Sequence, residues 1–294
     1  MNRKDKGNNQ ASARNLRQRG RERGLLPVFL CLLLLLVTSV QKVSGNDLPF
    51  KTGESVKMEV KFKYGVVIKG GTFESRIDLT SFQETPAIKS TLLLNTNSFF
   101  DGIYKMRDTL ISYADCNSII PLHHWRSVNE GGKHFFEEMT VHAHGDTYSK
   151  VRVIRTEKGK VKVDKILESH TPGFDLPNLF IYIRTLDYNS LTIGQTFHFS
   201  SFFGKRKTDI RCTYKGQQVV EKSKKLKYKT RKFSFDIMDE AFTESKDAIE
   251  IWVSDDENRL PIKLKAKLKI GAAEGLITSY KGLKYPFTAE VKLP

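Results

Sequence analysis

The alternation of apolar and charged side chains is the feature that most constrains the fold of this chain. In the run Val56-Lys57-Met58-Glu59-Val60-Lys61-Phe62-Lys63-Tyr64, every second residue is apolar and the others are charged. A period of two places successive side chains on opposite faces of a β-strand. The segment therefore predicts a strand with one apolar face and one solvated face.

Similar β-like runs fill most of the sequence that follows, with turn residues between them. Gly70-Gly71 predicts a hairpin turn after the first strand, because glycine accepts positive φ without steric cost. The expected strands cover residues 72–80, 87–96, 104–113, 119–128, 134–144, 148–157, 160–168, 195–203, 207–214, 217–222, 226–236, 248–254, 260–270, 275–283 and 286–293.

One helix is expected near residues 177–187. Leu179, Ile183 and Leu186 repeat at three- and four-residue spacing, and Pro177 suits a first helical turn. No linker, low-complexity tract or internal repeat follows Asn46. We therefore predict an all-β, mainly antiparallel fold, a curved sheet that is barrel-like or a sandwich, in a single domain over residues 46–294.

The N-terminal segment has the pattern of a secretory signal. Residues 1–24 carry eight Lys or Arg and two acids, and the sixteen residues from Leu25 to Val40 carry no charge. As a helix this stretch measures about 24 Å, shorter than the roughly 30 Å hydrocarbon core. We expect residues 1–45 to be a signal peptide that is cleaved after Gly45. The alternative is an uncleaved signal anchor.

Export places residues 46–294 outside the inner membrane, in the periplasm or secreted. Cys31 leaves with the signal peptide, so Cys116 and Cys212 remain in an oxidising compartment. Two cysteines there are expected to form a disulfide, although two separately buried thiols are the alternative.

Positive charge gathers between Lys205 and Lys232, where twelve Lys or Arg residues and two acids give a net charge of +10. An exported protein is not expected to meet nucleic acid. The expected partners are an anionic lipid, a glycan or an acidic envelope protein, which makes the domain membrane-proximal. A solvated sheet face rich in lysine is the simpler explanation. The candidate ligand-binding residues are Lys205, Arg206, Lys207, Lys224, Lys225, Lys227, Lys229 and Arg231.

Several short motifs resemble the domain-of-unknown-function 3108 family. They are Pro49-Phe50-Lys51-Thr52-Gly53-Glu54, Tyr64-Gly65 with Gly70, Tyr182-Ile183-Arg184 with Gly194, and Ile251-Trp252-Val253-Ser254-Asp255-Asp256 followed by Arg259-Leu260-Pro261 and Gly271. The resemblance covers residues 48–293. It implies a β-rich periplasmic domain of Gram-negative bacteria, and it implies no activity and no site residues.

No catalytic constellation stands out. The neighbouring acids Glu137-Glu138 and Asp255-Asp256 would point to opposite faces of a strand, unlike the facing carboxylates of glycosidases. His142 and His144 share a strand face, with His134 and Glu137 or Glu138 as further candidate ligands, but a solvated face explains them better than a metal. We predict no catalytic residue, no metal and no cofactor.

The phenylalanine doublets suggest a sheet with apolar residues on both faces. Phe99-Phe100, Phe135-Phe136 and Phe202-Phe203 place neighbouring rings on opposite sides of a strand. Such a sheet is either covered on both faces or curled around an apolar cavity. The resulting hypothesis is a non-enzymatic envelope protein that binds an anionic amphiphile, a lipid or a lipid-linked glycan. The alternative is an envelope protein–protein interaction module, and a hydrolase with an unrecognised site is less favoured.

Overall fold

The computed structural model describes residues 48–145, 147–203, 206–238, 245–268 and 271–292. This part of the chain contains fifteen strands and two helices. The strands are β1 (Glu54–Tyr64), β2 (Val66–Phe82), β3 (Thr85–Thr96), β4 (Arg107–Asp115), β5 (Pro121–Glu130), β6 (Lys133–Gly145), β7 (Tyr148–Glu157), β8 (Lys160–Ser169), β9 (Thr196–Phe203), β10 (Arg206–Ser223), β11 (Leu226–Met238), β12 (Ser245–Ser254), β13 (Pro261–Lys267), β14 (Ala272–Lys281) and β15 (Glu290–Lys292). The helices are α2 (Ser98–Tyr104) and α3 (Leu176–Thr185).

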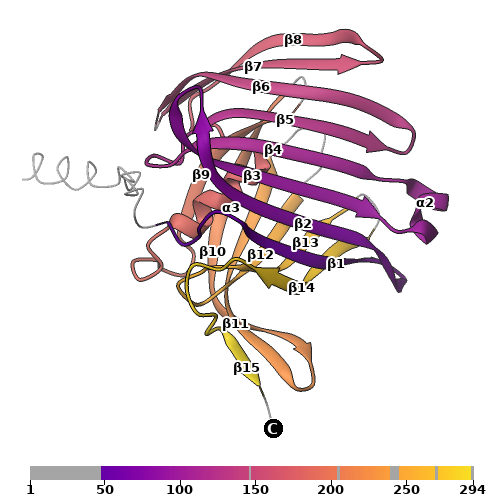
Figure 1. Cartoon of the computed structure of the whole chain (residues 1–294), viewed down its shortest axis with the longest axis vertical. Helices are drawn as coiled ribbons and strands as arrows, with labels where there is room; N and C mark the ends of the chain where they lie inside the picture. Colours follow the sequence, from indigo (N-terminus) through magenta and orange to yellow (C-terminus); the bar gives the residue numbers. More distant parts are fainter. Residues whose placement is uncertain (1–47, 146, 204–205, 239–244, 269–270, 293–294) are drawn as a thin grey trace, which may run out of the picture. The chain divides into compact units, whose positions relative to one another are not determined.

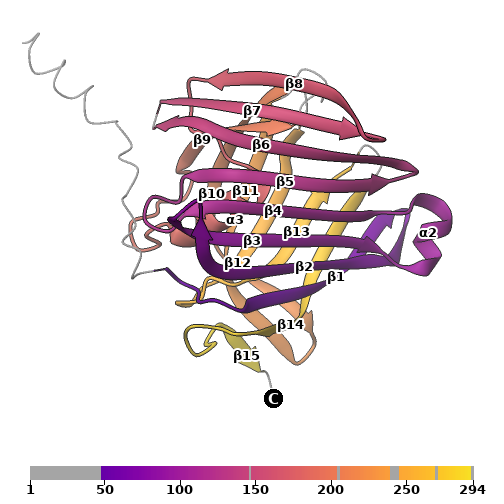
Figure 2. The same ribbon diagram turned by 45° about the horizontal axis from the view of Figure 1, so that its top comes forward.

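The strands form one antiparallel sheet made of two meanders. Strands β1 to β8 follow one another across the N-terminal half, and β9 to β14 follow one another across the C-terminal half. The two halves join where β1 pairs with β14. Figures 1 and 2 show the two halves facing each other with their strands running in different directions. The predicted all-β, mainly antiparallel, barrel-like fold is confirmed.

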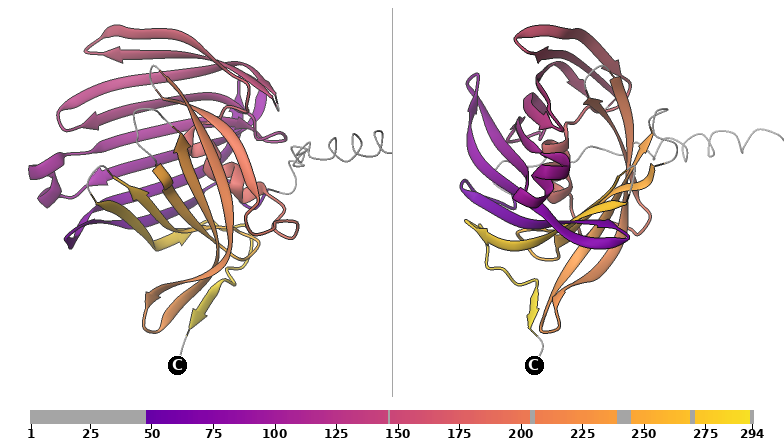
Figure 3. Two further views of the ribbon diagram at one scale, coloured as in Figure 1. Left: turned by 180° about the vertical axis from the view of Figure 1, so that it is seen from behind. Right: turned by 90° about the vertical axis from the view of Figure 1, so that its right-hand side faces the viewer.

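Helix α3 lies between the two halves of the sheet (Figure 3). Its Leu179 and Ile183 pack with Phe199, Phe233 and Ile251 of the C-terminal half. On the opposite side of the helix, Ile181 packs with Leu48, Phe50, Ile77, Ile88 and Ile119. We call the sheet face that is turned toward α3 the inner face.

The free edges of the sheet meet at a polar seam. The segment after β8 runs beside β9, where Ser200 N donates to Pro172 O and Phe174 N donates to Ser200 O, each over 2.8 Å. The Ser200 hydroxyl also lies 2.6 Å from the hydroxyls of both Ser169 and Thr171, and it donates to Asp209 Oδ1. These contacts bring the sheet close to closure, which explains its barrel-like form.

The first predicted turn is wrong in position. β2 runs without a break through Gly70 and Gly71, and the turn lies at Gly65, whose φ is +66°. A Cβ on Gly70 would lie 2.0 Å from the Phe62 ring, and one on Gly71 would lie 2.2 Å from the carbonyl oxygen of Asn95. The two glycines are therefore required by close packing on a strand rather than by a turn.

Two further elements differ from the sequence prediction. The expected strands 207–214 and 217–222 are one strand, β10, which bulges near Gly216. The short helix α2 is absent from the prediction, and it contains the doublet Phe99-Phe100. Asn97 caps this helix by accepting a hydrogen bond from Phe100 N.

Candidate functional site

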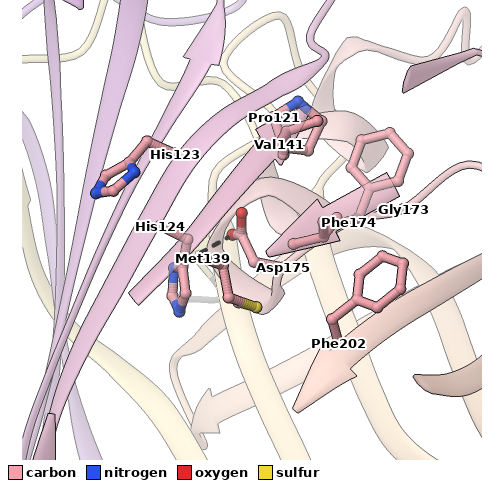
Figure 4. A pocket seen from close by; sticks show the side chains of 10 residues that line it. Pro121, His123, His124, Met139, Val141, Gly173, Phe174, Asp175 and Phe202 are labelled. Atoms are coloured by element: carbon pink, nitrogen blue, oxygen red, sulfur yellow. Dashed lines mark ion pairs between the residues drawn. The ribbon is translucent and has the colours of Figure 1, made fainter. Parts of the chain in front are cut away.

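The N-terminus of α3 is held by a buried polar cluster on the inner face. Asp175 is the N-cap, and its Oδ1 accepts from Asn178 N over 2.9 Å. The Ser112 hydroxyl donates to Asp175 Oδ2 over 2.7 Å. His124 faces the same carboxylate, with 3.8 Å between His124 Nδ1 and Asp175 Oδ1. Figure 4 shows the two side chains turned toward each other, with Met139 and Phe202 beside them. This cluster fixes where α3 begins.

Burial controls the charges of this cluster. Burial, together with the positive charge of Arg126, lowers the pKa of His124 to about 3. Burial raises the pKa of Asp175 to about 6, against the hydrogen bonds from Ser112 and Asn178. At neutral pH the imidazole is therefore neutral and Asp175 is a carboxylate that caps the helix.

The cluster does not have the geometry of a catalytic triad. In a triad the serine hydroxyl donates to the histidine, whereas Ser112 donates to Asp175. The adjoining cavity has a volume of about 10 Å³, close to the space that a single water molecule needs. We assign Ser112, His124 and Asp175 to the support of α3.

A row of three charged side chains crosses the inner face further along the same strands. Arg126 of β5, Glu137 of β6 and Arg155 of β7 lie directly opposite one another in register. Arg126 belongs to the inner face because it lies two residues after His124 on the same strand. Arg126 Nε donates to Glu137 Oε1 over 3.0 Å, and Arg155 Nε donates to Glu137 Oε2 over 2.8 Å.

This arginine row carries one net positive charge on the inner wall. The Glu137 side chain is 0% exposed, whereas Arg126 is 17% and Arg155 is 21% exposed. The Phe135 ring lies under both guanidinium groups, 5.5 Å from Arg126 Cζ and 4.2 Å from Arg155 Cζ. The Glu137 carboxylate and the Phe135 ring together hold the two arginines side by side. Part of each arginine side chain is exposed to solvent. Planar guanidinium groups in this arrangement are suited to bind a carboxylate or phosphate.

An acid pair lies next to the arginine row. Asp108 of β4 is buried, and its Oδ1 accepts from Asn129 N over 3.0 Å. Burial and a hydrogen bond with Glu130 raise the pKa of Asp108 to about 7. The Tyr104 hydroxyl donates to Glu130 Oε2 over 3.3 Å. Asp108 and Glu130 therefore add polar groups to the inner wall beside the arginine row.

The outer face of the same strands carries a shallow depression of about 290 Å³. Trp125, Phe136, Ile154, Glu138 and Thr156 line it, with Arg126 and Glu137 at its base. The Phe136 side chain is 50% exposed, and Val161 and Ile166 of the neighbouring strand β8 are also exposed. The sheet thus shows apolar residues on its outer face at this point, as the doublet Phe135-Phe136 suggested.

The predicted basic residues do not gather at one place. Arg206 and Lys207 begin β10, whereas Lys224 and Lys225 lie at its far end, about 50 Å away at the rise of an extended strand. Arg231 is tied into the fold, because its Nε donates to Asp255 Oδ1 and its Nη1 to Tyr188 O. Lys227 and Lys229 lie on β11. Lys205 lies outside the described residues.

The expected disulfide between Cys116 and Cys212 is wrong. Both cysteines are free thiols. Cys116 packs against the cluster of Leu48, Phe50 and Ile181, and Cys212 is buried in the cluster of Phe199 and Phe233. Residues of α3 belong to both clusters, so the helix lies between the two thiols. Burial raises the pKa of both thiols and keeps them protonated.

The candidate metal ligands do not converge. Within the described ranges, no group of three or more His, Cys, Asp or Glu side chains could hold a metal ion. His142 and His144 do not share a regular strand face, because β6 bulges between Val141 and Ala143. His144 Nε2 lies 3.2 Å from Gly173 O, near α3.

Sequence reasoning did not identify the arginine row. The sequence indicates Glu137 only as a candidate metal ligand or as half of a carboxylate pair, and no motif singles out Arg126 or Arg155. The three residues are separated by 11 and 18 positions. Only the pairing register of three strands brings them together. The sequence does contain one signal for this row: its three residues are charged, although they occupy strand positions that are expected to face inward.

The fold and the site together define a class of protein: a barrel-like antiparallel sheet that encloses one helix and carries charged residues on its inner wall. The family model described as "Protein of unknown function (DUF3108)" matches residues 57–278. The chain therefore belongs to this family, which confirms the resemblance found in its sequence motifs.

Among solved structures, the chain is similar to a β-barrel-like protein of domain of unknown function DUF1849 from Brucella abortus. The two share 9% sequence identity with a TM-score of 0.51, over 80% of this chain and 99% of that chain. This likeness concerns the fold alone. No curated protein matches the chain.

The predicted signal segment, residues 1–45, lies outside the described residues. None of the helices in the described ranges combines the length and the apolar character that a membrane crossing requires.

Proposed function

We propose that this protein is a non-enzymatic binding protein of the cell envelope whose ligand is an anionic amphiphile, a lipid or a lipid-linked glycan. The observation that carries the proposal is the arginine row, Arg126–Glu137–Arg155, on the inner face of the sheet. The acidic group of the ligand would bind the two guanidinium groups, and its apolar part would lie along the inner face.

The hydrogen bonding of Arg155 supports this arrangement. Its Nε and Nη2 both contact Glu137 Oε2, over 2.8 and 2.7 Å. Among the described residues, its Nη1 makes no hydrogen bond. A guanidinium group whose orientation is fixed and whose remaining N–H groups are available loses little entropy when it binds an anion. Within the row, Glu137 supplies one negative charge against two guanidinium groups, so a head group that brings a second negative charge would be attracted to the row.

The apolar part of the ligand has half-buried surface available on the same face. Val60, Phe62 and Leu94 lie on strands β1 and β3, and they are only partly buried. Phe62 stacks on Phe100 of α2, with 4.6 Å between the ring centroids. Burying such surface against an acyl chain is favourable by about 25 cal/mol per Å².

A fluorescent fatty acid and its neutral ester test the proposal. Parinaric acid should bind the wild-type protein at least tenfold more tightly than parinaric acid methyl ester, because only the acid presents a carboxylate to the arginines. The change Arg155→Gln should remove most of that difference, since a charge-assisted hydrogen bond is worth about 1.5–3 kcal/mol. Fluorescence titration measures both dissociation constants.

Arg152→Gln is the matched control. Arg152 lies three residues earlier on β7, on the outer face, where it pairs with Asp164 over 2.7 Å. This variant should retain the preference for the acid. Equal affinity for acid and ester in the wild-type protein, or an equal loss in both variants, would contradict the proposal.

The second candidate function is a protein–protein interaction module, and the outer depression favours it. The exposed Phe136 lies there with the half-buried Trp125 and Ile154, near the edge strand β8. Aromatic residues are enriched in protein interfaces. A stoichiometric protein partner that is lost in Phe136→Ser, together with no binding of parinaric acid, would favour this function over the first.

A further inference from the structure

The hairpin of β10 and β11 continues beyond the strands on either side of it. β9 pairs with β10 only as far as Thr213, and β12 pairs with β11 only from Thr230 onward. Beyond these limits, β10 and β11 pair with each other, and β11 also pairs with the short strand β15. We call residues 216–229 the basic hairpin. Figures 1 and 3 show it with β15 at the end of the sheet that lies lowest in the view.

The basic hairpin carries most of its charge near its tip. It contains the five lysines Lys222, Lys224, Lys225, Lys227 and Lys229 and one acid, Glu221, a net charge of +4. The adjoining β15 adds one acid, Glu290, and one base, Lys292, so the net charge of the whole projection stays at +4. Lys227 lies 3.8 Å from Glu221. In the part of the chain that the structure describes, Lys224, Lys225 and Lys229 have no ion-pair partner.

Packing at the base of the hairpin holds it in place. Val220 and Tyr228 are buried, and they pack in the same cluster as Trp252 and Phe287. Trp252 Nε1 donates to Gln218 Oε1 over 2.9 Å, and the Thr230 hydroxyl donates to Gln218 O over 2.8 Å. On the opposite face, the Val219 side chain is 65% exposed. The lysines are therefore displayed by a fixed scaffold.

We propose that the basic hairpin docks the protein on an anionic bilayer surface. The lysines lie around the projection, since Lys222 stacks over Tyr228 on the packed face while Lys229 lies opposite Val219 on the exposed face. Lysines on both faces suit a diffuse layer of charge better than a single ligand. Lysine is depleted in protein–protein interfaces, whereas each basic residue near an anionic membrane adds to the attraction. Charge complementarity thus favours a membrane over an acidic protein.

This inference is independent of ligand binding at the arginine row. The basic hairpin belongs to β10 and β11, whereas the arginine row belongs to β5, β6 and β7. A protein that binds an amphiphile needs to approach the membrane that supplies it. The hairpin would serve this approach and take no part in holding the ligand.

Co-sedimentation with vesicles tests the docking surface. Protein purified from cells that express the complete chain should bind vesicles that contain phosphatidylglycerol and should not bind pure phosphatidylcholine vesicles. Binding should fall as the salt concentration rises, because salt screens the attraction. The triple variant Lys224→Gln, Lys225→Gln and Lys229→Gln should bind at least tenfold more weakly.

The matched control removes the same charge elsewhere. Lys160, Lys162 and Lys165 of β8 are exposed lysines that also have no ion-pair partner in the described ranges. Their triple change to Gln should leave vesicle binding within about twofold of wild type. Both variants should keep the wild-type unfolding temperature and the wild-type affinity for parinaric acid.

Three results would overturn the inference. Equal weakening in the two variants would mean that only the total charge matters. Equal binding to both vesicle types would mean that charge is not recognised. A hairpin variant that keeps vesicle binding but loses binding to polyglutamate would assign the surface to an acidic protein.

Discussion

Glu54 and Arg184 form an ion pair that is fully enclosed by the fold. Arg184 Nη1 donates to Glu54 Oε1 over 2.7 Å, and Arg184 Nη2 donates to Glu54 Oε2 over 3.0 Å and to Asn258 O over 2.8 Å. The guanidinium lies over the Phe50 ring. The pair joins β1, α3 and the turn before β13. Glu54 and Arg184 both lie in motifs on which the sequence resemblance rests, and Arg184 also lies within the residues that the family model matches.

Breaking this pair should be costly. We expect Glu54→Gln to lower the free energy of unfolding by about 3–5 kcal/mol, because Arg184 would keep a buried charge without a counter-ion. Urea denaturation measures the loss. Glu74→Gln is the control, since Glu74 pairs with Lys57 near the surface and such pairs are worth about 0–1 kcal/mol. Equal losses in the two variants would show that the buried Glu54 pair contributes no more to stability than a surface pair does.

At the scale of single elements, the capping cluster of α3 makes stability depend on pH. The pKa of His124 in the folded protein, about 3, lies below the ordinary value of 6.5. Between these values the unfolded chain binds a proton that the folded protein does not, so His124 destabilises the fold as the pH falls. Asp175, with its pKa raised to about 6, acts in the opposite direction between its ordinary value and pH 6.

Removing His124 should separate these two effects. From pH 6.5 toward pH 3, the free energy of unfolding of His124→Leu should rise relative to wild type by about 1 kcal/mol per pH unit. Urea denaturation at a series of pH values measures this. Parallel curves for the two proteins would contradict a neutral buried imidazole.

Elements were predictable where their pattern was regular. The strands of 148–157, 160–169 and 196–203 match their expected ranges within one residue at each end, since each alternates strongly and turn residues bound it. Helix α3 was predicted because it spans enough turns to show a period. Helix α2 has seven residues, too few to show one. Gly70-Gly71 predicts a turn but lies within a strand, because close packing and turn formation both favour glycine.

At the scale of the whole molecule, closure of the sheet depends on contacts that no sequence pattern displays. Ser169 and Thr171 close the seam with Ser200, which lies 31 and 29 positions further along the chain. The arginine row arises in the same way, because the pairing register of β5, β6 and β7 brings its three residues together. The free cysteines show the same limit. The predicted export favours a disulfide, but two thiols on opposite sides of α3 cannot pair.

The proposed export of the protein is also a property of the whole molecule. We expect the mature protein to begin near Asn46, because the apolar run of sixteen residues is too short to anchor a helix stably in a bilayer. Intact-mass analysis of protein from the native envelope measures the N-terminus. A chain that retains residues 1–45 and is recovered only in detergent would indicate an anchor instead.

Native mass spectrometry of protein purified from the envelope, without delipidation, tests the central claim most directly. We predict that the wild-type protein and Arg152→Gln each carry one anionic amphiphile, which is released on unfolding. Arg155→Gln should carry much less of it at the same expression level. A wild-type protein that carries no such molecule, and that binds none when anionic lipid is added at low salt, would contradict the claim.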